Sequence, residues 1–285
     1  MTRLAAPLSP TDHRRDITGM TYVYPVVSRR SGGVSLGINL NPNNACNWRC
    51  IYCQVPNLTR GSAPPIDLAL LEAELRSLLT EIVHGRFLED HAPPGAALTD
   101  IALSGNGEPT SAREFEAVIG LVGRLLGEFA LKGKIKLVLI TNGSLIHRPA
   151  VERGLAHMAP LGGEVWFKLD SATGEGMRKI NGTRQTPEKA WENLVRAAGL
   201  CPTWLQTCVF ALDGKPPQTA EQEAYLAFLR RAVEEGIGLK GVLLYGLARP
   251  SHQPEAPRLS ALPAAWLEGY AEKIRRLGLT VKVSP

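Results

Sequence analysis

The chain has 285 residues, of which 44% are apolar and 21% charged, and its net charge is +5. This is the composition of an ordinary globular protein with a core of normal size. A membrane span is not expected, because no run of about 18 uncharged apolar residues occurs. Residues 1–16 also lack the apolar segment of a secretory signal, so we expect a cytoplasmic protein.

The predicted elements alternate between strands and helices along most of the chain. Residues 1–30 are predicted to be a loose N-terminal arm, and residues 31–285 to form one domain. The predicted strands are Val34–Leu40, Thr99–Leu103, Ile135–Ile140, Glu164–Leu169, Trp204–Leu212 and Leu239–Tyr245, with a short last strand at Leu279–Val283. The predicted helices are Ile66–Leu88, Ser111–Phe129, one from about Pro149, one from Thr186, Gln218–Glu235 and Leu262–Leu277.

Six strand–helix units in a row predict an α/β fold with a parallel sheet. A complete barrel of this kind has eight units, so six units favour a partial (β/α)6 barrel of parallel strands, with a flat doubly wound sheet as the alternative. In both folds, binding sites gather at the carboxyl ends of the strands.

Three of the five cysteines lie close together, at Cys46, Cys50 and Cys53. Clustered thiols in a reducing compartment are more often metal ligands than disulfides. Structural zinc and ordinary iron–sulfur clusters take four protein ligands, so three thiolates on one iron–sulfur cluster leave one iron open for a substrate. The alternative is a zinc site completed by a distant His or Cys. Cys201 and Cys208 are expected to be small buried hydrophobic residues.

Other polar residues follow the carboxyl ends of predicted strands. The second strand runs into Gly105-Asn106-Gly107-Glu108, where glycine lets the backbone approach a ligand closely. The later candidates are Asn142, Lys168, Asp170 and Gln206. A plain turn at the glycines and a buried Lys168–Asp170 pair of structural value only are the alternatives.

The cysteine spacing CxxxCxxC, with an aromatic residue just before the third cysteine, resembles the signature of the radical S-adenosylmethionine superfamily. The resemblance implies one [4Fe–4S] cluster on Cys46, Cys50 and Cys53, which reductively cleaves S-adenosylmethionine to a 5′-deoxyadenosyl radical. It places Tyr52 beside the adenine. GNGEP is similar to the GGEP motif of that family, which implies that Gly107 and Glu108 bind the methionyl end.

Two further roles follow from the same resemblance. It implies that Asp170 holds the ribose and that Lys168 holds the methionyl carboxylate or the substrate. It also implies an external low-potential electron donor of the flavodoxin or ferredoxin type.

Residues 24–60 are similar to a branch of small enzymes related to the wyosine-base synthase of tRNA. That synthase carries extra cysteines before the first cluster motif, and none occurs before Cys46 here. We therefore expect a single-cluster radical enzyme with an unidentified substrate, which is a small molecule, a peptide or an RNA. A tRNA base-modifying enzyme is one alternative, and a non-catalytic metal-binding or electron-transfer protein is another.

Two basic features keep open roles. Arg49 lies between two predicted ligands, and it either raises the potential of the cluster or is a solvated surface residue. Residues 176–184 are predicted to be a basic loop, which either binds an anion or is solvated. The net charge gives slight support for an anionic partner such as RNA, and a basic enzyme that never meets nucleic acid is favoured.

Overall fold

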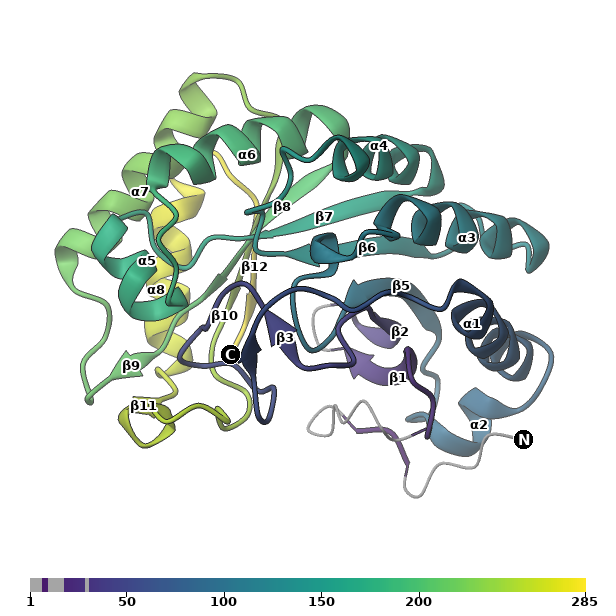
Figure 1. Ribbon diagram of the computed structural model, residues 1–285. Coiled ribbons are helices and arrows are strands. Elements are labelled where there is room, and N and C mark those ends of the chain that lie inside the picture. Colours follow the sequence, from purple (N-terminus) through teal and green to yellow (C-terminus); the bar gives the residue numbers. More distant parts are fainter. Residues whose placement is uncertain (1–6, 10–17, 29–30) are drawn as a thin grey trace.

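The computed structural model describes residues 7–9, 18–28 and 31–285. Its main feature is one eight-stranded sheet, in which only β1 is antiparallel to its neighbour. In spatial order the strands are β1 (Val23–Ser28), β2 (Gly33–Asn39), β5 (Leu98–Ser104), β6 (Lys136–Thr141), β7 (Gly163–Lys168), β8 (Thr203–Cys208), β10 (Leu239–Tyr245) and β12 (Val281–Ser284). The sheet does not close, so the predicted partial barrel is confirmed (Figure 1).

Helices connect the parallel strands and cover one side of the curved sheet (Figure 1). They are α1 (Leu68–Val83), α2 (Phe87–His91), α3 (Phe115–Glu128), α4 (Pro149–Met158), α5 (Gly174–Asn181), α6 (Pro187–Leu200), α7 (Thr219–Glu234) and α8 (Ala264–Arg275). None of the helices in the described ranges has the length and apolarity needed to cross a bilayer.

Strand alternation decides which side chains face the helices and which face the hollow of the barrel. In β7, Val165 and Phe167 belong to the large core shared with the helices, whereas Trp166 packs in a separate cluster on the other face with Trp204 of β8. The same alternation puts Lys168 and Gln206 on the inner face, at the carboxyl ends of β7 and β8. The sheet therefore aims these two polar side chains at the predicted site.

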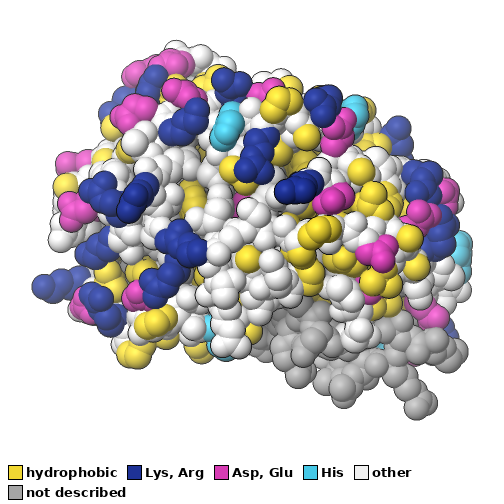
Figure 2. Space-filling view, viewed as in Figure 1, with side chains coloured by type: hydrophobic (Ala, Val, Ile, Leu, Met, Phe, Trp, Pro, Cys, Tyr) yellow, Lys and Arg dark blue, Asp and Glu magenta, His cyan; other side chains and the backbone are white. Residues whose placement is uncertain are grey.

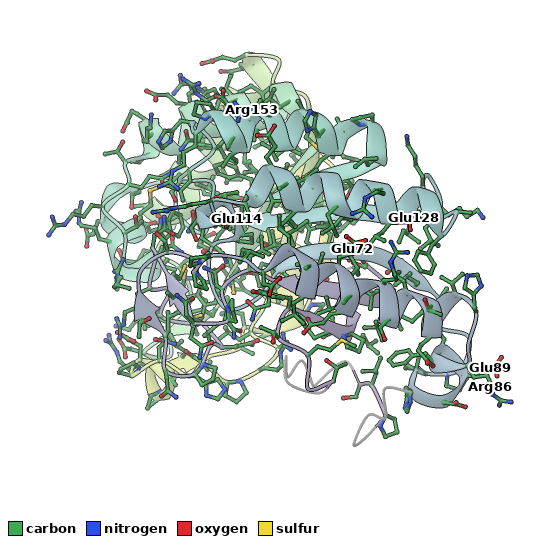
Figure 3. The ribbon with its side chains drawn as sticks, turned by 45° about the vertical axis from the view of Figure 1, so that its right-hand side comes forward. Glu72, Arg86, Glu89, Glu114, Glu128 and Arg153 are labelled. Carbon is green, nitrogen blue, oxygen red and sulfur yellow. The ribbon has the colours of Figure 1, made fainter. Side chains whose placement is uncertain are left out.

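Surface ion pairs join neighbouring helices outside the core. Glu72 of α1 accepts hydrogen bonds from Arg76 of its own helix and from Arg124 of α3. Glu128 of α3 pairs back to Arg76 at 2.6 Å, and Figure 3 shows Glu72 and Glu128 on the outer helical layer. Water screens exposed pairs of this kind, so they contribute little to stability and core packing holds the helices in place.

The predicted arm over residues 1–30 was wrong for Val23–Ser28, which form β1. This strand pairs antiparallel with β2, and the backbone amides of Thr21, Tyr22 and Val23 donate to the Glu74 carboxylate of α1. An edge strand tolerates Pro25, because one of its sides needs no ladder partner. The rest of the arm, apart from residues 7–9 and 18–22, lies outside the described residues.

Three predicted boundaries were also wrong. The predicted strand Trp204–Leu212 ends at Cys208, and β9 (Ala211–Leu212) leaves the sheet to pair with β11 (Leu259–Ser260). The predicted helix Ile66–Leu88 is split into α1 and α2. The basic loop predicted at residues 176–184 is mostly helical, because Thr173 caps the start of α5 and Gly182, at φ 58°, ends it.

Candidate functional site

The three cysteines lie on a loop that follows β2, with Cys46 in the short strand β3 (Ala45–Cys46) and Cys50 and Cys53 joined by a turn. The backbone amide of Cys53 donates to the carbonyl of Cys50 at 3.0 Å. All three thiols are free and half-buried. The pKa of Cys46 and of Cys50 is raised to about 12, mainly by burial, and for Cys46 the nearby charges of Glu108, Cys50 and Cys53 contribute to that rise. The thiols thus lie close enough to interact, and a bound cation is needed to keep them deprotonated.

Each of two sulfurs already accepts a weak hydrogen bond. Cys46 Sγ accepts from the amide of Trp48 at 3.4 Å, and Cys50 Sγ accepts from Asn181 Nδ2 of α5 at 3.4 Å. Within the described ranges, no three His, Cys, Asp or Glu side chains are drawn together as a ready-made metal site. The cysteines have the right chemistry for a soft metal centre, and their side chains must turn inward to share one.

A network of asparagines fastens the cysteine loop to the loop that follows β5. Asn39 Oδ1 accepts from the backbone amide of Asn106 at 3.0 Å, and Asn106 Nδ2 donates to Asn44 Oδ1 at 2.6 Å. The other side-chain atom, Asn106 Oδ1, is buried and has no partner in the described part of the chain. No motif in the sequence indicated that Asn39 and Asn44 would anchor the predicted GNGEP segment.

Both glycines of this segment are required by close packing. A Cβ at Gly107 would lie 2.1 Å from the carbonyl oxygen of Ala45, and one at Gly105 would lie 2.4 Å from Asn39 Oδ1. Gly105 also has φ +133°, a conformation that disfavours other residues. The glycines thus let the β5 loop touch the cysteine loop directly.

Glu108 is bound from within the protein. Its Oε1 accepts from the amide and the hydroxyl of Thr110 and from the hydroxyl of Thr141, and its Oε2 accepts from the amide of Asn142 at 2.7 Å. Burial raises the pKa of Glu108, and these hydrogen bonds oppose that rise. The carboxylate therefore ties the β5 loop to the end of β6. A direct contact with a methionyl group, which the resemblance implies, would be made at Oε2, which accepts only the Asn142 amide.

Asn142 also holds the cysteine loop. Its Nδ2 donates to Asn47 Oδ1 at 2.8 Å, Asn47 Nδ2 donates to Ser144 Oγ at 2.7 Å, and Ser144 Oγ donates to Asn142 Oδ1 at 2.7 Å. The three side chains form a closed ring between Cys46 and the end of β6. Asn142, predicted as a cofactor-binding residue, here holds the loop that carries the cysteines.

Lys168, Tyr52 and Asp170 meet on the inner face of the barrel. Lys168 Nζ donates to the Tyr52 hydroxyl at 2.5 Å, which in turn donates to Asp170 Oδ2 at 2.5 Å. Asn181 Nδ2 also donates to Asp170 Oδ2, at 2.6 Å, and the amide of Cys208 donates to Oδ1 at 2.9 Å. A chain of hydrogen bonds thus runs from Lys168 through Asp170 and Asn181 to the Cys50 sulfur.

The protonation states of this cluster follow from burial and charge. Burial lowers the Lys168 pKa, but the charges of Asp170, Tyr245, Cys50 and Cys208 together outweigh it and hold that pKa well above its usual value. Burial and Asp170 both raise the pKa of Tyr52. Lys168 is therefore a cation and Tyr52 a neutral hydroxyl. The Asp170 side chain is 0% exposed, so a contact between Asp170 and ribose requires this carboxylate to give up a protein partner.

Two buried polar atoms near the strand ends lack a partner within the described residues. They are the acceptor Asn106 Oδ1 beyond β5 and the donor Gln206 Nε2 on β8. Leaving such an atom unpaired costs about 1–3 kcal/mol, so a ligand that supplies a partner at these two strand ends gains binding energy. Gln206 and Asn106 thus remain the best candidates for direct contact with a cofactor.

A segment after β10 covers the outer side of the cysteine loop and carries residues that sequence reasoning missed. Ser251 Oγ donates to the carbonyl of Ile51 at 2.8 Å, and the backbone amide of His252 donates to the carbonyl of Cys53 at 2.9 Å. Arg49 forms a two-pronged ion pair with Glu255, with Nη2 and Oε2 2.9 Å apart. Arg49 thus serves to pin this covering segment. Nothing in the sequence pairs residues about two hundred positions apart.

The two remaining cysteines, Cys201 and Cys208, lie on opposite faces of the sheet. Cys208 is 2% exposed and lies on β8 in a cluster with Ile51, Tyr52 and Phe210. Burial raises the pKa of both Cys201 and Cys208. Cys201 lies where α6 ends, on the helix side of the sheet.

The family is shown by a direct comparison. The family model described as "Radical SAM superfamily" matches residues 40–229, which is well over half of the chain. The chain therefore belongs to the radical SAM superfamily and is an enzyme. Members of the family in general use S-adenosylmethionine and an iron–sulfur cluster, together with a reductant and a substrate.

Individual relatives agree with this assignment. A UPF0026 protein of Helicobacter pylori is 28% identical over 238 residues, which are 83% of this chain and 68% of that protein. A UPF0026 protein of Synechocystis is 29% identical over 160 residues, 56% of this chain and 52% of its own length.

Two solved structures share the fold. A radical SAM methyltransferase from Sphaerobacter thermophilus has a TM-score of 0.61 at 17% identity, covering 92% of this chain and 77% of its own. TYW1 with a lysine–pyruvate adduct bound has a TM-score of 0.53 at 13% identity, covering 88% and 74%.

Proposed function

We propose that the chain is a single-cluster radical S-adenosylmethionine enzyme in which Cys46, Cys50 and Cys53 hold one [4Fe–4S] cluster. The proposal rests on the direct contact between the two motifs. The loop that carries the three cysteines packs against the GNGEP segment after β5, with no room for a Cβ at Gly107. When bound, the cluster and S-adenosylmethionine supply a 5′-deoxyadenosyl radical, which removes hydrogen from a substrate.

Side chains of the protein are available to bind and orient S-adenosylmethionine. Asn106 Oδ1 and Gln206 Nε2 offer an acceptor and a donor for the polar groups of the amino-acid end. Lys168, held as a cation and 17% exposed, faces the same hollow and suits a carboxylate. Tyr52 is fixed at its hydroxyl, so its ring is a rigid wall on which an adenine can rest.

Iron content and product formation test the proposal. Protein reconstituted under anaerobic conditions should hold about four irons and four sulfides. It should form 5′-deoxyadenosine from S-adenosylmethionine and dithionite. Cys50→Ala should lose both the cluster and the product.

Cys201→Ala is the matched control, because Cys201 is buried on the helix side of the sheet. It should keep the iron and the product. One zinc and no iron in anaerobically isolated protein, or product formation that survives Cys50→Ala, would show the ligand assignment to be wrong. Iron without 5′-deoxyadenosine would instead indicate an electron carrier.

A further inference from the structure

Basic side chains gather around the outer rim of the cysteine loop. Figure 2 shows Lys and Arg concentrated over the part of the surface where Figure 1 places α5, β9 and β11. We call this group the basic belt. Its members are Arg49, Arg60, Arg178, Lys179, Arg184, Lys215 and Arg258.

The belt touches the cysteine loop itself. Arg60 Nη1 donates to the carbonyl of Asn47 at 2.8 Å, and its Nη2 donates to the carbonyl of Gly182 at the end of α5. A Cβ at Gly182 would lie 2.7 Å from the carbonyl oxygen of Arg49, so α5 abuts the loop directly. Both acceptors of Arg60 are neutral carbonyls, and no carboxylate in the described ranges forms an ion pair with it.

Few acidic groups oppose the belt. Arg49 pairs with Glu255, and Arg258 pairs with Asp213 at 2.6 Å. The pKa of Asp213 is lowered by Arg258 first and also by Lys179 and Lys215, so all three cations surround one carboxylate. Among the residues with described positions, the other belt members make no ion pair. Those members are Arg60, Arg178, Lys179, Arg184 and Lys215.

The belt faces away from the hollow in which the chemistry is proposed. From one loop, Cys50 and Tyr52 point inward to Asn181 and Asp170, whereas Arg49 points outward to Glu255. A substrate must reach the inner face, but an electron donor needs only to approach the cysteines from outside.

We infer that the basic belt is the docking surface for a small acidic electron-carrier protein. The inference rests on the proposed function, because it assigns the source of the electron that the reaction needs. In each encounter the reduced carrier loses one electron and the centre held by the three cysteines gains it. Complementary charge steers such an encounter and raises its rate, most strongly at low salt.

A charge reversal tests the inference on the reconstituted protein, with hydroquinone flavodoxin as the donor. Lys179→Glu with Arg184→Glu should lower the rate of flavodoxin-driven 5′-deoxyadenosine formation, and of flavodoxin association, at least about tenfold at low salt. The dithionite-driven rate should not change, because dithionite needs no docking surface. The wild-type flavodoxin rate should fall with added salt, and the variant rate should fall less.

The control is Lys132→Glu with Lys134→Glu, an exposed pair before β6 at the opposite end of the sheet. It should keep both rates. Unchanged flavodoxin association in the belt variant, or an equal loss in the control, would overturn the inference. So would a belt variant that releases tRNA while still associating with flavodoxin, since the surface would then be an RNA interface. Failure of the proposed function shows separately, as absence of product with dithionite.

Discussion

Strand β7 carries two buried carboxylate–lysine clusters, one near each end, and they are built differently. At the amino end, Glu164 is bound by Lys136 at 2.9 Å and by Lys240 at 2.7 Å, with these lysines 50% and 39% exposed. Beyond the carboxyl end, Asp170 is 0% exposed and its lysine, Lys168, is 17% exposed. The first cluster opens to solvent, and the second is closed.

The partners of the two carboxylates also differ. Both partners of Glu164 are partly exposed lysines, Lys136 of β6 and Lys240 of β10. Asp170 instead accepts from Tyr52 of the cysteine loop and from Asn181, which also contacts the Cys50 sulfur. A buried ion pair is weak evidence for function by itself. Its connection to the cysteine loop is what separates the Asp170 cluster from its structural counterpart.

The largest effect is expected from Asp170→Asn. Every neighbour of this carboxylate is a donor, so the new amide must face one of them with its own N–H, and Lys168 loses its counter-charge. We expect the free energy of unfolding to fall by about 3–5 kcal/mol, measured by urea denaturation at neutral pH. Glu164→Gln is the matched control and should lose far less. Equal losses would mean that the two clusters are equivalent.

Asn181→Leu should have the next largest effect. It removes one N–H from the Asp170 carboxylate and one from the Cys50 sulfur. The free energy of unfolding should fall by about 1.5–3 kcal/mol. Because hydrogen bonds to ligand sulfur raise the reduction potential, the potential of the reconstituted centre should fall, as measured by a redox titration.

Asn193→Leu provides the comparison, since Asn193 is as fully buried as Asn181 but lies in α6. Asn193→Leu should not change the reduction potential of the reconstituted centre. A potential that is insensitive to Asn181→Leu would break the proposed link between the Asp170 cluster and the cysteine loop.

Tyr52→Phe should have a smaller effect on stability. It removes the hydroxyl between Lys168 and Asp170, and the free energy of unfolding should fall by about 0.5–1.5 kcal/mol. Tyr225→Phe removes another buried hydroxyl, 2.6 Å from Thr207, and should cost a similar amount. Only the Tyr52 change should slow 5′-deoxyadenosine formation, and equal slowing by both would deny Tyr52 a special role.

The smallest effect concerns Glu164 and pH. Burial raises its pKa, but hydrogen bonds from Lys240 and Lys136 outweigh burial and hold the pKa below the usual 4.5. Its stabilising contribution is therefore complete above pH 4.5 and is lost as the pH falls through the lowered value. With half-exposed partners we expect about 1 kcal/mol or less. Denaturation curves from pH 7 to pH 3 should fall less steeply for Glu164→Gln than for the wild type.

Much of the fold could be predicted from the sequence, because each parallel strand is a local apolar run followed by an amphipathic helix. All six predicted strands occur, and the short last strand occurs as β12. The errors lie where long-range pairing outweighs the local pattern. Val23–Ser28 become a strand only because β2 and Glu74 satisfy their backbone groups, and Trp204–Leu212 divides because its last residues find β11.

The candidate site was predictable in its location and less so in its contacts. The strand-end rule predicted side chains at the ends of β6 and β7, and there Lys168 and Asp170 meet Tyr52 while Asn142 binds Asn47 of the cysteine loop. It did not show that Glu108 and Asp170 are bound by other protein groups, since donors such as Thr141 and Asn181 come from other segments.

By itself, the sequence determined the family, the order of the parallel strands of the sheet, and the residues that can ligate a soft metal. These properties depend on residue types and on short spacings along the chain, and both can be read directly from the sequence. Only the tertiary structure decided which side chains meet across it, such as Asn181 with Cys50 and Arg49 with Glu255, 131 and 206 positions apart. Such contacts depend on how the sheet curves and where each loop folds back, and these are properties of the whole packed chain.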